Sequence, residues 1–145
     1  MANFVYDSYK EGLMKWEINL NDWGDVIKVA LFTSSYTPDQ AADAFFDDIT
    51  WESEWTWYMS WGSVLWTKTI SVADNVAKFD WGDIIWTEVS LSANSAVMYK
   101  YVETESVFDP TASPLIAYFD FWGTKTASEG DFKIIWNADG IITIE

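Results

Sequence analysis

The stretch SVLWTKTISV (63–72) sets the pattern for the second half of the chain, because its apolar residues alternate with other residues. Four apolar residues fall on one face at a period of two, interrupted by Lys68: Val64, Trp66, Ile70 and Val72. A period of two is typical of a β-strand that buries one face. We therefore expect a strand here, with Trp66 packed in the core.

Six further segments have strand-like composition, and turn-rich segments such as ADN, DPTASP and SEGD lie between them. They are VAKFD (76–80), TEVSLS (87–92), SAVMYKYV (95–102), LIAYFDF (115–121), DFKIIWN (131–137) and IITIE (141–145). Asp139-Gly140, between the last two, is a strong hairpin signal. Many short strands at this spacing predict an antiparallel sandwich or barrel.

The N-terminal third adds helical patterns. Tyr6, Tyr9, Leu13 and Trp16 recur at three- and four-residue spacing, which predicts a short amphipathic helix over about residues 4–15. VIKVALF (26–32) is apolar on both faces, as expected of a central strand covered on two sides. Thr37-Pro38-Asp39 is typical of a helix start. The buried stripe of that second helix would be Ala41, Ala42, Phe45 and Ile49.

Together these patterns predict a mainly β fold for residues 1–145. We expect a single-domain antiparallel β-sandwich or barrel with one or two short helices in the N-terminal third. At 145 residues the chain is long enough to bury a core without disulfides or metals.

Composition excludes most catalytic chemistry. The chain holds eleven tryptophans but no histidine, no cysteine and no arginine. A histidine general base, a Ser-His-Asp triad, a cysteine nucleophile and a His/Cys zinc site are therefore impossible. We expect no enzymatic activity, no cofactor and no metal site. Tryptophan is the residue most enriched at binding hot spots, so the composition indicates a binding protein.

Charge narrows the class of partner. The formal net charge is −15, from 23 acidic residues against 8 lysines. Phosphates of nucleic acids and of anionic lipids repel such a surface, so we expect neither as a partner. No stretch approaches the roughly 20 apolar residues of a transmembrane helix.

Two groups of acidic residues have candidate roles. Asp39, Asp43 and Asp47 recur at four-residue spacing, which favours the solvated face of a helix; a calcium site would need further oxygen ligands. The second group lies near two tryptophans, as in a glycosidase cleft, but spacing alone shows no carboxylate pair. It consists of Asp80, Asp83 and Glu88, with Trp81 and Trp86 as neighbours.

Three segments resemble a family of small virion proteins of tailed bacteriophages. They are KVALFTSSYTPD (28–39), NVAKFDWGDIIWTEVSLSANSAVMYK (75–100) and LIAYFDFWGTKTASEGDFKIIWNADGIITI (115–144). Members of that family typically read KVAL-TSSYTPD, AKFDADDVTWSNATITARYAVIY and GDFTIQWNADGIL in the same order. The resemblance implies a virion-associated structural protein and brings no catalytic residues.

The chain departs from the family pattern in its tryptophans. WESEWTWYMSWGSVLW (51–66) stands where family members have small, polar residues of the type SGTGYTAGGATL. Tryptophan also replaces small or acidic residues at 81 and 122, and Ser-Ala-Asn-Ser (92–95) stands where arginine is usual. Core packing and sugar stacking are the alternative roles. We expect an intermolecular interface formed by Trp51, Trp55, Trp57, Trp61, Trp81 and Trp122.

The predicted function is that of a bacteriophage virion structural protein. A capsid decoration or cement protein, or another lattice-forming subunit, fits best, acting through aromatic contacts with itself or other virion proteins. A tail- or fibre-associated or tube-forming protein is one alternative. A carbohydrate-binding β-sandwich module is the other. The protein would be made in the host cytoplasm and located in the virion.

Overall fold

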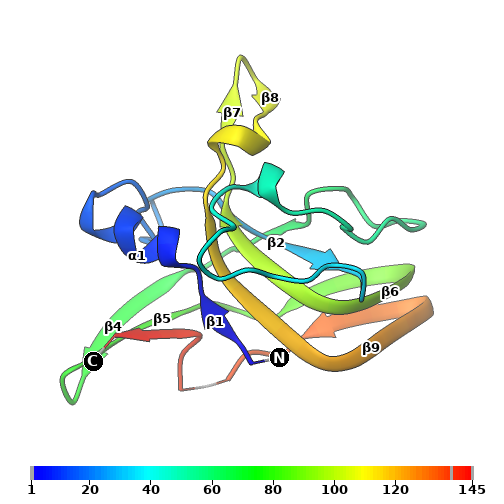
Figure 1. Cartoon of the computed structure of the whole chain (residues 1–145). Coiled ribbons are helices and arrows are strands. Elements are labelled where there is room, and N and C mark those ends of the chain that lie inside the picture. Colours follow the sequence, from blue (N-terminus) through cyan, green and yellow to red (C-terminus); the bar gives the residue numbers. More distant parts are fainter. Residues whose placement is uncertain (1, 138, 145) are drawn as a thin grey trace.

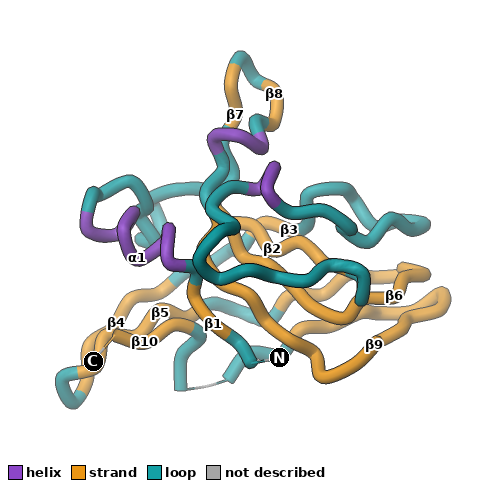
Figure 2. Tube along the Cα trace, viewed as in Figure 1, coloured by secondary structure: helices purple, strands orange, loops and turns teal. Residues whose placement is uncertain are grey.

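The computed structural model describes residues 2–137 and 139–144 and is mainly β (Figure 1, Figure 2). Every strand pair is antiparallel. The elements are β1 (Phe4–Val5), α1 (Asp7–Met14), β2 (Ile27–Phe32), the 3₁₀ turn η1 (Phe46–Asp48), β3 (Ser63–Val64), β4 (Thr69–Ala73), β5 (Val76–Asp80), β6 (Ile84–Lys100), β7 (Glu103–Thr104), β8 (Val107–Phe108), the 3₁₀ turn η2 (Pro110–Ala112), β9 (Leu115–Ile134) and β10 (Ile142–Ile144). The predicted fold class is confirmed.

The strands form two sheets and a separate hairpin. The larger sheet has the order β1-β9-β6-β2-β3, and the smaller has the order β10-β5-β4. The hairpin β7–β8 projects away from both, at the top of Figure 1. The turn between β4 and β5 holds Asp74 and Asn75 with φ of 51° and 65°, so the predicted ADN turn is confirmed.

β6 and β9 are much longer than the predicted strands, with 17 and 20 residues. They pair from Ile84 opposite Ile134 to Tyr99 opposite Leu115, with several bulges. The predicted SEGD turn lies inside β9, where Glu129 has a φ of 48°. Bulges absorb the extra residues and bend the ladder, so segments that look separate in sequence form one continuous pair.

The larger sheet is buried on both faces at its centre. On β2, Val29 and Leu31 belong to one hydrophobic cluster, and Ala30 and Phe32 belong to a second. The first cluster also contains Phe79 of β5, so it lies between the two sheets. The two-faced pattern of residues 26–32 therefore predicts β2 correctly.

The first predicted helix is present, but it begins at Asp7, after the short strand β1. Tyr6 and Tyr9 are buried at this junction, where Tyr6 Oη lies 2.8 Å from Tyr36 Oη. Trp16, predicted to share the apolar face of this helix, lies beyond its end and is 93% exposed.

The prediction of a second helix is wrong. The chain forms turns after Asp39 and then only the 3₁₀ turn η1, so Ala41, Ala42 and Phe45 are exposed. The Asp39 carboxylate accepts hydrogen bonds from the backbone N–H groups of Ala41 and Ala42, both at 3.0 Å. Such side-chain bonds compete with helical backbone bonds and favour turns.

A second aspartate binds the backbone in the same way a few residues later. Asp48 Oδ2 accepts hydrogen bonds from the backbone N–H groups of Ala44 at 2.9 Å and Phe45 at 2.8 Å. Of the predicted buried stripe only Ile49 is buried, and Phe46 fills the core beside it.

The single strand predicted at residues 63–72 is also wrong, because a turn divides it into β3 and β4, in different sheets. Thr67 has a φ of 58° at this turn. Trp66 is 77% exposed, so the predicted core packing is incorrect, and Lys68 is buried instead. Lys68 turns inward because its Nζ donates to the carbonyl oxygen of Asp25 at 2.5 Å.

The predicted C-terminal hairpin is wrong as well. β10 pairs with β5, with Ile142 opposite Phe79, and makes no ladder with β9. Gly140 has a φ of 104° and donates from its backbone N–H to the carbonyl oxygen of Asn137, so a turn is present. The turn carries the chain across to the smaller sheet, where Ile142 enters the core.

Gly62 provides a test of the packing between β2 and the segment before β3. Its φ is 75°, and a Cβ atom there would lie 1.9 Å from the Val29 carbonyl oxygen. We predict that Gly62→Ala lowers the free energy of unfolding by about 2 kcal/mol or more, measured by urea denaturation. Gly82→Ala is the control, because a Cβ there meets no atom within 4 Å. Equal stability of the two variants would contradict the packing.

Candidate functional site: exposed tryptophans on a fixed loop

Tryptophan is the most frequent residue among the large exposed hydrophobic side chains. Eight of the eleven are exposed, two are buried and Trp136 is partly buried. The exposed set is Trp16, Trp23, Trp51, Trp55, Trp57, Trp61, Trp66 and Trp122. Exposed hydrophobic side chains that gather in one patch mark interaction surfaces, whereas those scattered singly do not.

The predicted interface residues divide into an exposed majority and one buried residue. Trp51, Trp55, Trp57, Trp61 and Trp122 are exposed. Trp81 is buried, so it cannot contribute to a surface. Its ring centroid lies 4.8 Å from that of Phe79 and 5.0 Å from that of Trp136, partners that the local sequence around Trp81 does not reveal.

Two exposed tryptophans were missed by the sequence patterns. Trp16 follows the end of α1, and Trp23 is 95% exposed in a turn before Gly24. For Trp23, the turn-forming pair Asn21-Asp22 is the sequence signal that indicates an exposed turn. The side chain of Asn21 accepts a hydrogen bond from the N–H of Asp22 at 2.8 Å.

Four of the exposed tryptophans lie in residues 51–61, which we call the tryptophan loop. Its first part lies beside the end of β2 and is hydrogen-bonded to it. Thr33 N–H donates to the Trp51 carbonyl at 3.0 Å, and Ser53 N–H donates to the Leu31 carbonyl at 2.7 Å. The buried hydroxyl of Ser53 donates to the carbonyl oxygen of Ser92 on β6 at 3.0 Å. The loop is therefore tied to two strands of the larger sheet.

The second part of the loop is held by one carboxylate. Glu52 Oε1 accepts hydrogen bonds from the Tyr58 hydroxyl at 2.9 Å and from the Trp61 backbone N–H at 2.6 Å. The Tyr58 hydroxyl in turn accepts from Leu31 N–H at 2.9 Å, and the Tyr99 hydroxyl donates to the Trp61 carbonyl at 2.6 Å. These bonds fix the loop while its indole rings face outward.

Glu52 is an unusual anchor because it is mostly buried. Burial raises the pKa of Glu52 to about 7, although the hydrogen bonds from Tyr58 and Trp61 act in the opposite direction. The nearby Glu54 raises this pKa slightly further and Lys28 lowers it. The carboxyl group therefore titrates near neutral pH.

The backbone of the tryptophan loop is strained. Trp51, Trp57 and Trp61 have φ values of 74°, 68° and 72°, in the left-handed region. Trp16 and Trp122 share this feature, with φ of 64° and 56°. Glycine adopts the left-handed region readily, whereas a side chain costs roughly 1–2 kcal/mol per residue there. The side chains at these positions therefore oppose the stability of the isolated chain.

The aromatic surface continues from the loop to the projecting hairpin. The Trp61 ring centroid lies 5.0 Å from that of Phe108, which stacks on Tyr101 at 4.9 Å. Lys28 Nζ also lies over the Tyr101 ring, 3.7 Å from its centroid. Tyr101 and the exposed Trp66 line the same groove, which also contains Lys28.

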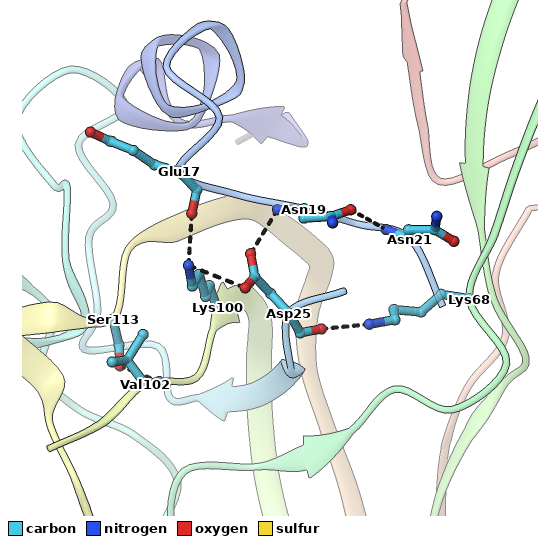
Figure 3. A network of polar contacts seen from close by, with 8 residues as sticks. All are labelled: Glu17, Asn19, Asn21, Asp25, Lys68, Lys100, Val102 and Ser113. Atoms are coloured by element: carbon cyan, nitrogen blue, oxygen red, sulfur yellow. Dashed lines mark hydrogen bonds and ion pairs between the residues drawn. The ribbon is translucent and has the colours of Figure 1, made fainter. Parts of the chain in front are cut away.

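Polar groups beside this groove form hydrogen bonds and an ion pair with other residues of the chain, as Figure 3 shows. The Asp25 carboxylate accepts from the Asn19 backbone N–H at 2.6 Å and pairs with Lys100 Nζ at 3.2 Å. Lys100 also donates to the Glu17 carbonyl at 2.7 Å. Lys68 is held by Asp25, as described above. These contacts connect the segment before β2 to β6 and to the turn before β4.

The acidic residues weighed from the sequence do not form a metal site. Asp43 Oδ2 accepts hydrogen bonds from the Tyr36 hydroxyl and the Asp39 N–H. Asp83 pairs with Lys133 Nζ at 3.2 Å. Within residues 2–137 and 139–144, no group of three histidine, cysteine, aspartate or glutamate residues is arranged to hold a metal ion. The one α-helix of this part of the chain is also too short to span a membrane.

Comparisons of the chain with protein-family models, with curated proteins and with solved structures find no match.

The buried carboxyl of Glu52 predicts a pH dependence. The folded protein holds its proton up to about pH 7, whereas the ordinary value is 4.5, so this group's contribution to stability falls as pH rises from about 4.5 to 7. Glu52→Gln keeps an oxygen that can accept both hydrogen bonds and removes the charge. We predict a higher melting temperature than wild type at pH 8, with the difference disappearing toward pH 4.5.

The control is Glu54→Gln, an exposed change on the same loop. A Glu52→Gln protein that melts below wild type at pH 8, or by the same difference at every pH, would show that the charged carboxylate stabilises the loop.

Substitution by glycine should change the stability in opposite directions at Trp57, which has a positive φ, and at Trp55, which does not. Trp57→Gly should raise the free energy of unfolding of the monomer by about 1 kcal/mol, because it relieves the strained φ of 68°. Trp55→Gly is the matched control, since Trp55 is exposed but is not among the residues with positive φ. It should lower stability by about 0.5–1 kcal/mol. Urea denaturation of both variants measures the difference; a loss of stability in Trp57→Gly would refute it.

Proposed function

We propose that this protein is a structural subunit of a bacteriophage virion, and that it forms a lattice through its tryptophan loop. A capsid decoration or cement protein is the form that we favour. The partners are further copies of the chain or other virion proteins. The family resemblance of residues 28–39, 75–100 and 115–144 supports the virion setting.

The observation that carries the proposal is the display of Trp51, Trp55, Trp57 and Trp61 on a fixed backbone. A loop already held by Glu52 and Tyr99 loses little conformational entropy when it binds, so its exposed rings can contribute fully to affinity. Three of the four tryptophans also strain the backbone. Strain of this kind persists at functional sites, where the side chain gains more in the complex than it costs in the free chain.

The charge of the protein supports an outward-facing position. At a net charge of −15, the surface is repelled by packaged DNA, and an acidic outer layer also keeps particles apart in solution. A tail- or fibre-associated subunit or a tube-forming subunit uses the same contacts in a different symmetry, and these are the alternative placements.

A carbohydrate-binding module is the second candidate. The exposed ring of Trp66 beside the groove that Tyr101 lines favours it, because indole faces stack on sugar rings. A sugar-binding module would be a monomer whose tryptophan fluorescence responds to oligosaccharides, and Trp66→Ala would abolish that response without changing particle association.

The test of the proposed function compares two exposed tryptophans. We predict that Trp55→Ala keeps the wild-type melting curve as a monomer but weakens association by about 2 kcal/mol or more, which is roughly a 30-fold rise in the dissociation constant. Light scattering and cosedimentation with particles measure the association. Trp23→Ala, outside the loop, is the control and should associate as wild type does. Wild-type protein that stays a 16.7 kDa monomer and ignores virions would overturn the proposal.

A further inference from the structure

The smaller sheet ends in an exposed edge strand. All five residues of β4 are exposed, and no strand among residues 2–137 and 139–144 pairs with its outer side. Its sequence, TISVA, contains no charge, no proline and no glycine. An edge of this kind offers unpaired backbone N–H and C=O groups and is a template for pairing with another strand.

The other edges of the structure are protected in ways that β4 is not. β1 and β3, which end the larger sheet, are only two residues long, and β10, the other edge of the smaller sheet, has three. β1 covers β9 only at Ala117 and Tyr118, and the part of β9 beyond it carries Lys125, Glu129 and Asp131. Charges and short strands discourage edge pairing, so the bare edge at β4 is an exception within the described part of this protein.

The face of β4 next to the core is apolar and reaches past the core into solvent. The register of the smaller sheet places Ile70, Phe79 and Ile142 in one row across the strands, and Val72, Ala77 and Ile144 in the next. Phe79 and Ile142 are buried, whereas Ile70, Val72 and Ile144 are 56%, 72% and 53% exposed. Extending the sheet beyond β4 would cover the exposed sides of Ile70 and Val72, whereas Ile144 lies on β10 at the opposite edge.

We propose that β4 pairs antiparallel with β4 of a second copy of this chain, with Ser71 opposite Ser71 on the two-fold axis. This register places Ile70 opposite Val72 of the other copy, twice, on the same face of one continuous six-stranded sheet. The inference rests on the proposed function, and it names the partner and the contact that begin assembly.

Self-complementarity favours a second copy as the occupant. With Ser71 on the two-fold axis, the exposed Ile70 and Val72 of each copy face those of the other, so one strand supplies both sides of the contact. β4 carries no acidic side chain, so two chains of net charge −15 can approach each other there. A two-fold contact of this type closes on itself and gives a discrete dimer.

A single introduced cysteine tests the contact, because the chain has none of its own. Directly opposite residues in an antiparallel pair have Cα atoms about 4.5–5.5 Å apart, within the range of a disulfide. We expect Ser71→Cys to shift under mild oxidation from 16.7 kDa to twice that mass on a non-reducing gel. Val107→Cys, also exposed but on β8, is the control and should remain a monomer under the same conditions.

A pair of charge variants tests the register. Ile70→Lys with Val72→Lys, and Ile70→Glu with Val72→Glu, should each be monomeric. Mixing the two double variants should restore the dimer, since each introduced lysine would then face an introduced glutamate of the other copy.

Two outcomes would overturn the inference: Ser71→Cys that cross-links no faster than Val107→Cys, or a mixture of the charge variants that stays monomeric. Wild-type protein that still assembles on particles in that case leaves the proposed function standing, and only the β4 contact fails.

Discussion

The antiparallel pairing of β6 with β9 is the interaction on which the rest of the structure depends. One half of this ladder, from Ser95 opposite Asp120 to Tyr99 opposite Leu115, lies in the larger sheet beside β2. The other half places Trp86, Phe132 and Ile134 in the same core cluster as Phe79 of the smaller sheet. The two strands thus belong to the larger sheet and also supply the core that it shares with the smaller sheet, and Figure 1 shows that β9 bends along its length. Loops that are hydrogen-bonded to this pair of strands are therefore held in fixed positions.

The tryptophan loop shows how a stable frame can hold unfavourable residues. Its hydrogen bonds to β2 and β6, together with the partly buried Glu52 and the buried Tyr58, set the path of the loop. Glycine would follow that path without strain at three of the four tryptophan positions. The rings of Trp51, Trp55 and Trp57 are more than half exposed, and under the proposed function they contact neighbouring subunits.

Sequence patterns predict those parts of the structure in which local and long-range preferences agree. The two-faced pattern of β2 and the turn at Asp74 and Asn75 are of this kind. Prediction fails where a distant partner decides the outcome. Lys68 is buried because Asp25 accepts its hydrogen bond, and Trp81 because Trp136 packs against it. The helix expected after Pro38 is replaced by turns because aspartate side chains bind the backbone. The departure of residues 51–66 from the family pattern points to the loop tryptophans, whereas their left-handed backbone is visible only in the structure.

The most direct test of the lattice assignment is electron microscopy of purified native particles at a resolution that resolves side chains. The account predicts that this chain repeats in a regular array, with residues 51–61 buried against a neighbouring subunit. Intact-mass measurement of the chain from the same particles, compared with 16.7 kDa, verifies that the assembled subunit carries the tryptophans. Particles that lack the chain, or an array in which the tryptophan loop faces solvent, would contradict the account.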